Sequence, residues 1–186
     1  MSVTLLLIRH GQTEENLAHI LQGQQDGHLT SEGIQQAVNL GKQLLNEHID
    51  TFISSDLGRA LDTSRLINQS LCLNIIKEPL LRERDFGKYT GCPYGTQIPS
   101  DDKSVETVEQ LYNRACKWLE SILHQYDDHV ILAVSHGLFL RFIQAAIMGV
   151  HFKNITPMHN TEIRRYTVHS YFAPSLAKEH IETVES

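Results

Sequence analysis

The apolar run Thr4–Ile8 leads directly into Arg9–Gly11, an Arg-His-Gly sequence, and this ending constrains the fold more than any other feature. A short aliphatic run bounded by polar residues predicts a buried strand. Val130–Val134 predicts a second such strand, followed by Ser135–Gly137, a Ser-His-Gly sequence. In open α/β sheets, ligands bind at the carboxyl ends of the strands. Two strands that each end on a histidine and a glycine therefore predict a phosphate-handling site at this edge of a sheet.

Short apolar runs alternate with helical periodicity along the chain, which is typical of a layered α/β domain. The segment Leu29–Gly33 predicts a helix start. The buried face of that helix is predicted to contain Ile34, Ala37, Val38, Gly41, Leu44 and Leu45. Further helices are predicted at 57–68, at 138–148 and along Val108, Leu111, Ala115, Trp118, Leu119 and Ile122. Further strands are predicted at 50–54, at 73–76, at 162–169 and, weakly, near 180–184.

Residues 1–186 are expected to form a single domain, because the chain has the length of one domain and contains no internal repeat or linker. Residues 78–104 interrupt the alternation with prolines, glycines and the acidic pair Asp101 and Asp102. Long irregular segments of this kind are usually lids or binding loops. We therefore expect a short lid-like excursion beside the site.

Charge and hydropathy exclude some classes of function. A net charge of −6 gives no sign of the basic surface that binds nucleic acid, and no apolar stretch has the length of a membrane span. The run Val3–Ile8 is too short for the core of a signal peptide and lacks a basic segment before it. The cysteines, Cys72, Cys92 and Cys116, are odd in number and widely spaced, which favours reduced thiols and a cytoplasmic protein.

The eleven histidines are scattered and show neither HxxxH nor the Cys/His spacing of a zinc site. We therefore expect no metal and no cofactor. The histidines near the carboxyl end, His159, His169 and His180, are expected at the surface. Local positive charge at Arg9 and Arg59 would still suit a small anionic substrate.

Phosphoryl transfer needs a nucleophile, positive donors around the phosphate oxygens and an acid for the leaving oxygen. His10 can act as the nucleophile through a neutral ring nitrogen. Arg9 and Arg59 can form paired hydrogen bonds with phosphate oxygens. Asn16 and His136 can donate further hydrogen bonds to the same group.

Glu83 lies in the excursion and is the candidate acid. A carboxylic acid there can protonate the leaving group and then take a proton from water. Glu78, Asp85 and Glu106 are nearby alternatives for this role.

Several blocks of the sequence, taken in order, resemble the motifs of the histidine phosphatase superfamily, also called phosphoglycerate mutase-like proteins. They are Leu7–Asn16, the segment with Gly23, Asp26, Leu29, Thr30 and Gly33, then Ser54–Ala60, Leu81–Gly91, Ser135–Gly137 and His159–Ile163. Together these blocks extend over most of the chain.

The resemblance implies a three-layer α/β/α fold around a mostly parallel, mixed sheet. It also implies a phosphohistidine intermediate on His10 and no requirement for metal. Arg9, Arg59 and His136 would surround the phosphate, together with Asn16 and Gly137, and Glu83 would be the proton donor. Two further residues, Gln22 and Gly23, are candidates for substrate contact, although a polar loop accounts for Gln22 equally well.

The resemblance leaves the reaction open between hydrolysis and mutase chemistry. Mutases of this family generally carry a longer excursion after the acid loop, with tryptophan and basic residues, whereas residues 91–104 are few, acidic at Asp101 and Asp102, and free of tryptophan. This difference favours a phosphatase. A phosphoglycerate mutase-type phosphotransferase and a non-catalytic module that binds a phosphorylated ligand are the alternatives. The substrate can be a sugar phosphate, a nucleotide-like ester such as α-ribazole phosphate, or a phosphoprotein.

Overall fold

The apolar run near the amino terminus forms strand β1 (Ser2–Arg9), which has a neighbouring strand on each side. The computed structural model describes residues 1–169. Strand β1 pairs in parallel with β4 (Val130–Ser135) and antiparallel with β5 (Ile163–His169). The remaining strands continue the parallel part, in the order β3-β2-β4-β1-β5. Their bounds are Thr51–Ser54 for β2 and Ile75–Lys77 for β3. The predicted mixed, mostly parallel sheet is therefore confirmed.

Helices alternate with the strands along the chain. They are α1 (Glu14–Leu17), α2 (Ser31–Gln43), α3 (Gly58–Leu71), α4 (Val108–Gln125) and α5 (Gly137–Met148). Short 3-10 turns are η1 (Leu44–Asn46), η2 (Pro79–Leu81), η3 (Gly87–Tyr89) and η4 (Phe152–Asn154). Within residues 1–169 there is no helix with both the length and the apolar composition that crossing a membrane requires.

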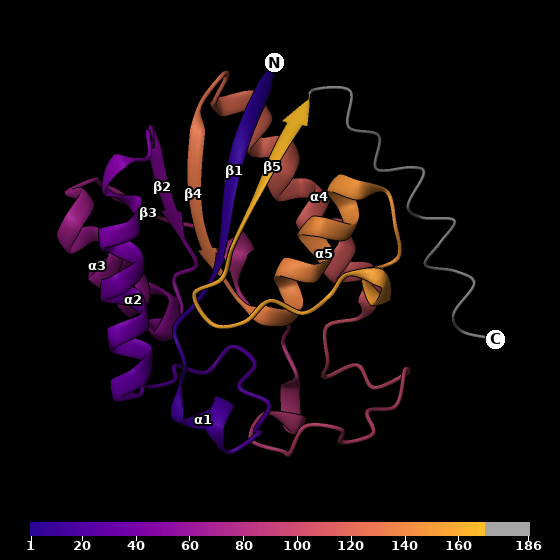
Figure 1. Cartoon of the computed structure of the whole chain (residues 1–186). Coiled ribbons are helices and arrows are strands. Elements are labelled where there is room, and N and C mark those ends of the chain that lie inside the picture. Colours follow the sequence, from indigo (N-terminus) through magenta and orange to yellow (C-terminus); the bar gives the residue numbers. More distant parts are fainter. Residues whose placement is uncertain (170–186) are drawn as a thin grey trace.

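The side chains of β1 are buried on both faces of the sheet, which explains why its sequence is continuously apolar rather than alternating. Leu5 and Leu7 pack into a core with α4 and α5, while Leu6 and Ile8 pack into a second core with α2 and α3. Figure 1 shows these two pairs of helices on opposite sides of the sheet. Burial of each such side chain contributes roughly 1.5–3 kcal/mol. The predicted three-layer α/β/α architecture is confirmed.

Side-chain caps set the starts of two helices. At α2, the Thr30 hydroxyl accepts a hydrogen bond from the Gly33 amide at 2.9 Å. At α4, Thr107 and Gln110 bond reciprocally to each other's backbone amides and form a capping box. Such caps satisfy amides that have no partner within the helix. The α2 start therefore lies where the sequence predicts it.

One predicted helix face needs correction. Ile34 and Leu45 are exposed, at 44% and 58% of their surface, whereas α2 buries Gly33, Ala37, Leu40 and Gly41. Ile34 follows directly after buried Gly33 and so points about 100° away around the helix axis. Leu45 lies in the turn η1, after α2 has ended, where the helical spacing no longer applies.

The other predicted elements are present, with ends shifted by up to about three residues, which is within the usual ambiguity of helix ends and short strands. Helix α1 is not predicted by the sequence analysis, because one turn is too short to show a periodic pattern. His159 and His169 are exposed, as expected. The weak strand expected near 180–184 and the expected exposure of His180 lie outside the described residues.

Sheet register brings the two histidine turns together. Arg9, the last residue of β1, lies opposite Ser135, the last residue of β4. The His10 amide then donates to the Ser135 carbonyl at 3.0 Å, which places His136 next to His10 in space. The carboxyl edge of β1 and β4 is therefore where the predicted site can form.

The excursion at 78–104 is irregular apart from η2 and η3, and α4 anchors its beginning. Arg114 of α4 donates to the carbonyl oxygens of Leu80 and Arg82 at 2.8 and 2.7 Å, and it forms an ion pair with Glu106. Arg82 in turn pairs with Asp56, just before α3. These bonds hold the segment that carries Glu83 against the carboxyl edge of the sheet.

Candidate active site

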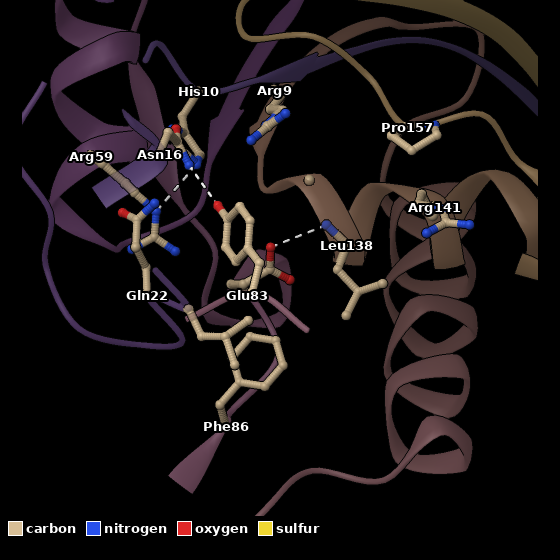
Figure 2. A pocket seen from close by; sticks show the side chains of 13 residues that line it. Arg9, His10, Asn16, Gln22, Arg59, Glu83, Phe86, Leu138, Arg141 and Pro157 are labelled. Carbon is tan, nitrogen blue, oxygen red and sulfur yellow. Dashed lines mark hydrogen bonds between the residues drawn. The ribbon is translucent and has the colours of Figure 1, made fainter. Parts of the chain in front are cut away.

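A pocket of about 410 Å³ lies at the carboxyl ends of β1 and β4 (Figure 2). It contains seven of the predicted site residues: Arg9, His10, Asn16, Gln22, Arg59, Glu83 and Gly137. The rest of its lining consists of Leu21, Phe86, Tyr94, Leu138, Arg141 and Pro157. The predicted His136 and Gly23 are not among the lining residues, although the His136 ring lies next to that of His10. The structure thus gathers residues from four of the sequence blocks, together with Gln22, into one cavity.

His10 has one ring nitrogen fixed by the backbone. Its Nδ1 atom lies 2.7 Å from the Gly11 carbonyl oxygen, and because a carbonyl only accepts, Nδ1 carries the proton. Nε2 therefore keeps its lone pair, and Arg59 Nε donates to it at 3.3 Å. Burial, reinforced by the charges of Arg59 and Arg9, holds the pKa of His10 well below its usual value. A neutral histidine with an unprotonated Nε2 at the pocket has the form that a nucleophile needs.

Gly11 is required for packing between two turns of the chain. A Cβ atom on Gly11 would lie 2.7 Å from the Gly33 carbonyl oxygen, so a larger residue would push α2 away. The Gly11 amide donates to the Thr63 hydroxyl at 2.9 Å, which ties the turn to α3. Packing against α2 therefore requires glycine at this position.

Arg59, in the first turn of α3, is buried and lines the pocket beside His10. Its terminal nitrogens donate to the Gln25 and Gly23 carbonyl oxygens at 2.6 and 2.9 Å. Gly23 contributes this carbonyl, and its backbone φ of +53° is in the left-handed region that favours glycine. Burial lowers the pKa of Arg59, and the nearby Glu83 carboxylate opposes this shift. The guanidinium is therefore held rigidly against His10.

Arg9 approaches the pocket from the end of β1. Its Nη1 atom donates to the Met158 carbonyl oxygen at 2.8 Å, while its Nε atom is buried and has no hydrogen-bond partner within residues 1–169. A Cβ on Gly137 would come within 3.2 Å of that Nε, so the glycine leaves the guanidinium its space. Burial lowers the pKa of Arg9. A buried donor without a partner is costly unless a ligand satisfies it.

His136 is fully buried at the start of α5, with its ring centroid 5.2 Å from that of His10. Its Nε2 atom lies 2.8 Å from the Ser55 hydroxyl oxygen. Its Nδ1 atom has no partner in the described part of the chain. Burial and the charge of Arg59 hold the pKa of His136 well below its usual value. Arg9 and His136 thus each hold a buried nitrogen that an anion in this region can satisfy.

Glu83 lies against the amino-terminal end of α5. Its carboxylate accepts hydrogen bonds from the Leu138 and Phe139 amides, both at 3.1 Å, and from the Arg84 amide at 2.9 Å. The helix end and these amides stabilise negative charge there. Figure 2 shows the carboxylate inside the pocket, bonded to Leu138.

The alternative acids have other partners. Glu78 accepts a hydrogen bond from the Leu80 amide, and Asp85 from the Gly87 amide. Glu106 is paired with Arg114. None of these three carboxylates is among the residues that line the pocket, so the geometry favours Glu83.

Sequence reasoning missed several residues around the site. The Asn16 amide nitrogen donates to the Tyr94 hydroxyl at 3.2 Å, so the excursion reaches the part of the pocket that Asn16 lines. Asn160 donates to the His10 carbonyl at 2.9 Å and lies in the block His159–Ile163 that the resemblance includes. Tyr94 gave no signal, because a single aromatic residue in an irregular segment has no pattern. Residues 1–169 contain no cluster of three or more histidine, cysteine, aspartate or glutamate side chains arranged to hold a metal.

Comparison with known proteins places this arrangement in a family. The sequence profile of the histidine phosphatase superfamily (branch 1) matches residues 5–173. A curated relative from Proteus mirabilis (strain HI4320), described as a probable phosphoglycerate mutase, GpmB, is 34% identical over 164 residues. The match covers 77% of this chain and 74% of that protein.

Solved structures share the fold. YhfR from Bacillus stearothermophilus superposes with a TM-score of 0.80 at 27% identity, covering 88% of this chain and 90% of that one. A phosphoserine phosphatase from Entamoeba histolytica, in complex with 3-phosphoglyceric acid, gives a TM-score of 0.76 at 25% identity, covering 88% and 89%. The family predicted from the sequence is confirmed by these matches.

The buried neutral histidines make a prediction about acid stability. Because the folded-state pKa of His10 lies below the unfolded value of about 6.5, the unfolded chain binds one more proton in the window between the two values. The free energy of unfolding should therefore fall as pH drops below 6.5, by about 1.4 kcal/mol per pH unit for each such histidine.

In urea titrations, the loss of stability between pH 7.5 and 5.5 should be smaller in His10→Gln than in wild type by about 1.4 kcal/mol in total, because the extra proton binds mainly in the lower half of this range. The exposed His124, replaced by glutamine, serves as the control and should keep the wild-type slope. Equal slopes for wild type and His10→Gln would contradict the buried neutral state of His10.

Proposed function

We propose that this chain, which belongs to the histidine phosphatase superfamily (branch 1), hydrolyses small phosphate monoesters through a phosphohistidine on His10. The observation that carries the proposal is the state of that ring. The Gly11 carbonyl holds the proton on Nδ1, and Nε2 is presented at the pocket beside Arg59. Few roles other than nucleophilic attack explain a buried, neutral histidine between two arginines.

In the first half-reaction, the substrate phosphate lies between Arg9 and Arg59. The Arg59 Nε–H group moves its hydrogen bond from His10 Nε2 to a phosphate oxygen. The freed Nε2 lone pair attacks phosphorus, the P–N bond forms and the P–O bond to the leaving group breaks. Glu83, which takes up a proton when the negatively charged phosphate binds beside it, gives that proton to the leaving oxygen, and the alcohol departs.

In the second half-reaction, water takes the place of the alcohol. Glu83 accepts a proton from this water, whose oxygen attacks phosphorus as the P–N bond breaks. His10 regains its Nε2 lone pair, inorganic phosphate leaves, and Glu83 again carries the proton. Each group ends the cycle as it began.

Other predicted residues complete the phosphate site in this scheme. With the Ser55 hydroxyl donating to Nε2, His136 carries its proton on Nδ1 and donates it to a phosphate oxygen. Asn16 donates from its amide, and Gly137 leaves room for Arg9. The donors surround a charge that grows in the transition state, which is the arrangement that lowers the barrier.

The part of the pocket lining that comes from the excursion favours hydrolysis over mutase chemistry. Residues 78–104 form a short lid in this proposal, and they contribute Phe86 and Tyr94 to the pocket beside Glu83. Tyr94 is 46% exposed, which leaves that side of the pocket near solvent. The description of the Proteus relative as a phosphoglycerate mutase keeps the mutase reaction as the second candidate. A mutase would convert 3-phosphoglycerate in the presence of a bisphosphorylated primer.

The proposal includes the cellular setting. The reaction uses no metal and no cofactor, because the arginines and histidines supply the positive charge and the donors. The partner is a small phosphorylated metabolite rather than a nucleic acid. None of the three cysteines forms a disulfide, which suits a reducing compartment, and we place the protein in the cytoplasm.

Removal of the nucleophile tests the proposal. Wild type should hydrolyse p-nitrophenyl phosphate in EDTA, and His10→Ala should lose more than about a thousandfold in kcat, because no other group can form the phosphoenzyme. His124→Ala, at an exposed position on α4, should keep wild-type activity. Comparable activity in His10→Ala, with its fold verified by circular dichroism, would contradict the role of His10.

Removal of the acid should depend on the leaving group. Since kcat/KM reports the steps up to phosphorylation of His10, Glu83→Gln should lower kcat/KM for alkyl phosphates by about 10²–10⁴-fold. Aryl phosphates leave with little acid help and should lose less than about tenfold. Equal losses with both substrates would show that Glu83 acts structurally or that another carboxylate is the acid.

A further inference from the structure

Arg141 lies in the pocket but away from the two histidines. It occupies α5 one helical turn beyond Gly137, a rise of about 6 Å along the axis. In Figure 2, Glu83 and Leu138 separate the Arg141 guanidinium from His10 and Arg59, and Pro157 lies above it. The pocket therefore has a second positive group at its opposite end.

This charge has no acidic partner in the part of the chain that the structure describes. Within residues 1–169, five arginines form ion pairs: Arg65, Arg82, Arg114, Arg164 and Arg165. The arginines without such a pair are Arg9, Arg59, Arg84 and Arg141, and all of these except Arg84 line the pocket. Unneutralised positive charge is thus concentrated where a ligand would bind.

The side chain of Arg141 is anchored by one edge only. Its Nε atom donates to the Ile155 carbonyl oxygen at 3.0 Å, and its guanidinium carbon lies 5.5 Å from the Phe152 ring centroid. No hydrogen bond to the described residues engages its two terminal nitrogens. Burial lowers the pKa of Arg141 with no carboxylate opposing it, whereas Glu83 opposes the shift at Arg9 and Arg59. A bound anion would neutralise this unpaired positive charge of Arg141.

We propose that Arg141 binds a carboxylate of the substrate, so that the enzyme prefers phosphate monoesters of short carboxylic acids. The inference rests on the proposed function, because it assumes that the ester phosphate lies at His10. Two terminal guanidinium nitrogens match the two oxygens of a carboxylate. A second phosphate would carry more charge than one arginine balances, whereas the first phosphate has two arginines and two histidines around it.

The wall between the two anion sites limits the substrate further. Leu138 lies between Glu83 and Arg141 and is apolar, as are the nearby Leu21 and Phe86. Gly137 and Arg141 are one helical turn apart along α5, and a carbon chain of a few bonds spans such a rise. The expected substrate is therefore a compact phosphorylated hydroxy acid or amino acid rather than a long or polymeric ester.

A pair of substrates that differ at one group tests the assignment. 3-Phosphoglycerate carries a carboxylate where racemic glycerol 1-phosphate carries a neutral CH₂OH group. Wild type should show a kcat/KM at least tenfold higher for 3-phosphoglycerate. Arg141→Met, which keeps an unbranched apolar stem, should reduce this preference at least tenfold. Arg141→Lys should keep part of it, because the charge remains.

The ratio of kcat/KM for 3-phosphoglycerate to kcat/KM for glycerol 1-phosphate distinguishes recognition of the substrate by Arg141 from support of the fold by Arg141. Arg141 also braces the loop at Ile155, and loss of that brace alone would lower kcat/KM for both substrates equally. Arg65→Met, which removes a positive charge from an exposed position on α3, should leave the ratio unchanged. Equal losses for both substrates in Arg141→Met, or no preference in wild type, would overturn the inference.

The two proposals can fail separately. Hydrolysis of p-nitrophenyl phosphate without a preference for the carboxylate would reject the role of Arg141 and leave the phosphatase intact. Absence of all hydrolysis would reject the proposed function. In that case, calorimetry with 3-phosphoglycerate still tests Arg141, because Arg141→Met should weaken binding at least tenfold relative to glycerol 1-phosphate. Unchanged relative binding would reject the inference.

Discussion

The hydrogen bond from His10 Nδ1 to the Gly11 carbonyl oxygen is the interaction on which the rest of the site depends. It decides which ring nitrogen faces the pocket, and it is possible because the turn after β1 is held in place from several directions. Gly11 packs against Gly33 and donates to Thr63, while the His10 amide bonds to β4. The sheet and both helices of one layer thus fix the orientation of a single imidazole ring.

The site also depends on charges that the protein itself leaves unbalanced. Arg9, Arg59 and Arg141 line one pocket without an ion pair among the described residues, although Glu83 lies close enough to influence the first two. Such burial opposes folding unless other interactions offset it, since desolvated charge is costly. The cost is spread over backbone carbonyl acceptors at Gly23, Gln25 and Met158 and is removed when an anion binds. In the proposed reaction, Arg9 and Arg59 bind the substrate phosphate.

Sequence alone predicted much of this arrangement, for physical reasons that can be stated. The strands β1 and β4 are buried on both faces, so their composition identifies them, and their polar endings mark the ligand edge. Arg59 lies at that edge because α3 begins just after β2. The sequence could not identify Tyr94 or Arg141 as pocket residues. Tyr94 lies in irregular backbone, and Arg141 on a mostly apolar helix is equally compatible with a surface arginine.

The limits of periodicity explain the one error in the buried face of α2. Helical spacing assigns a residue to a face only to within about one position, so Ile34, next to the buried Gly33, was wrongly placed on the buried face. The spacing also applies only within the helix, so Leu45, which follows the end of α2, was wrongly placed as well. The choice between Glu83 and its neighbouring carboxylates was likewise open in the sequence. The fold favours Glu83 because it brings the α5 amides to that residue, a contact between positions far apart in the chain.

The central claim is that phosphate is carried covalently on His10. The most direct test is a rapid-quench experiment with a radiolabelled aryl phosphate, whose leaving group departs with little acid help, using Glu83→Gln to slow breakdown of the intermediate. The account predicts labelled protein whose label survives alkali, is lost in acid, maps to the peptide containing His10 and is absent from His10→Ala. Label that persists in His10→Ala, or turnover by wild type with no labelled protein at any time, would contradict it.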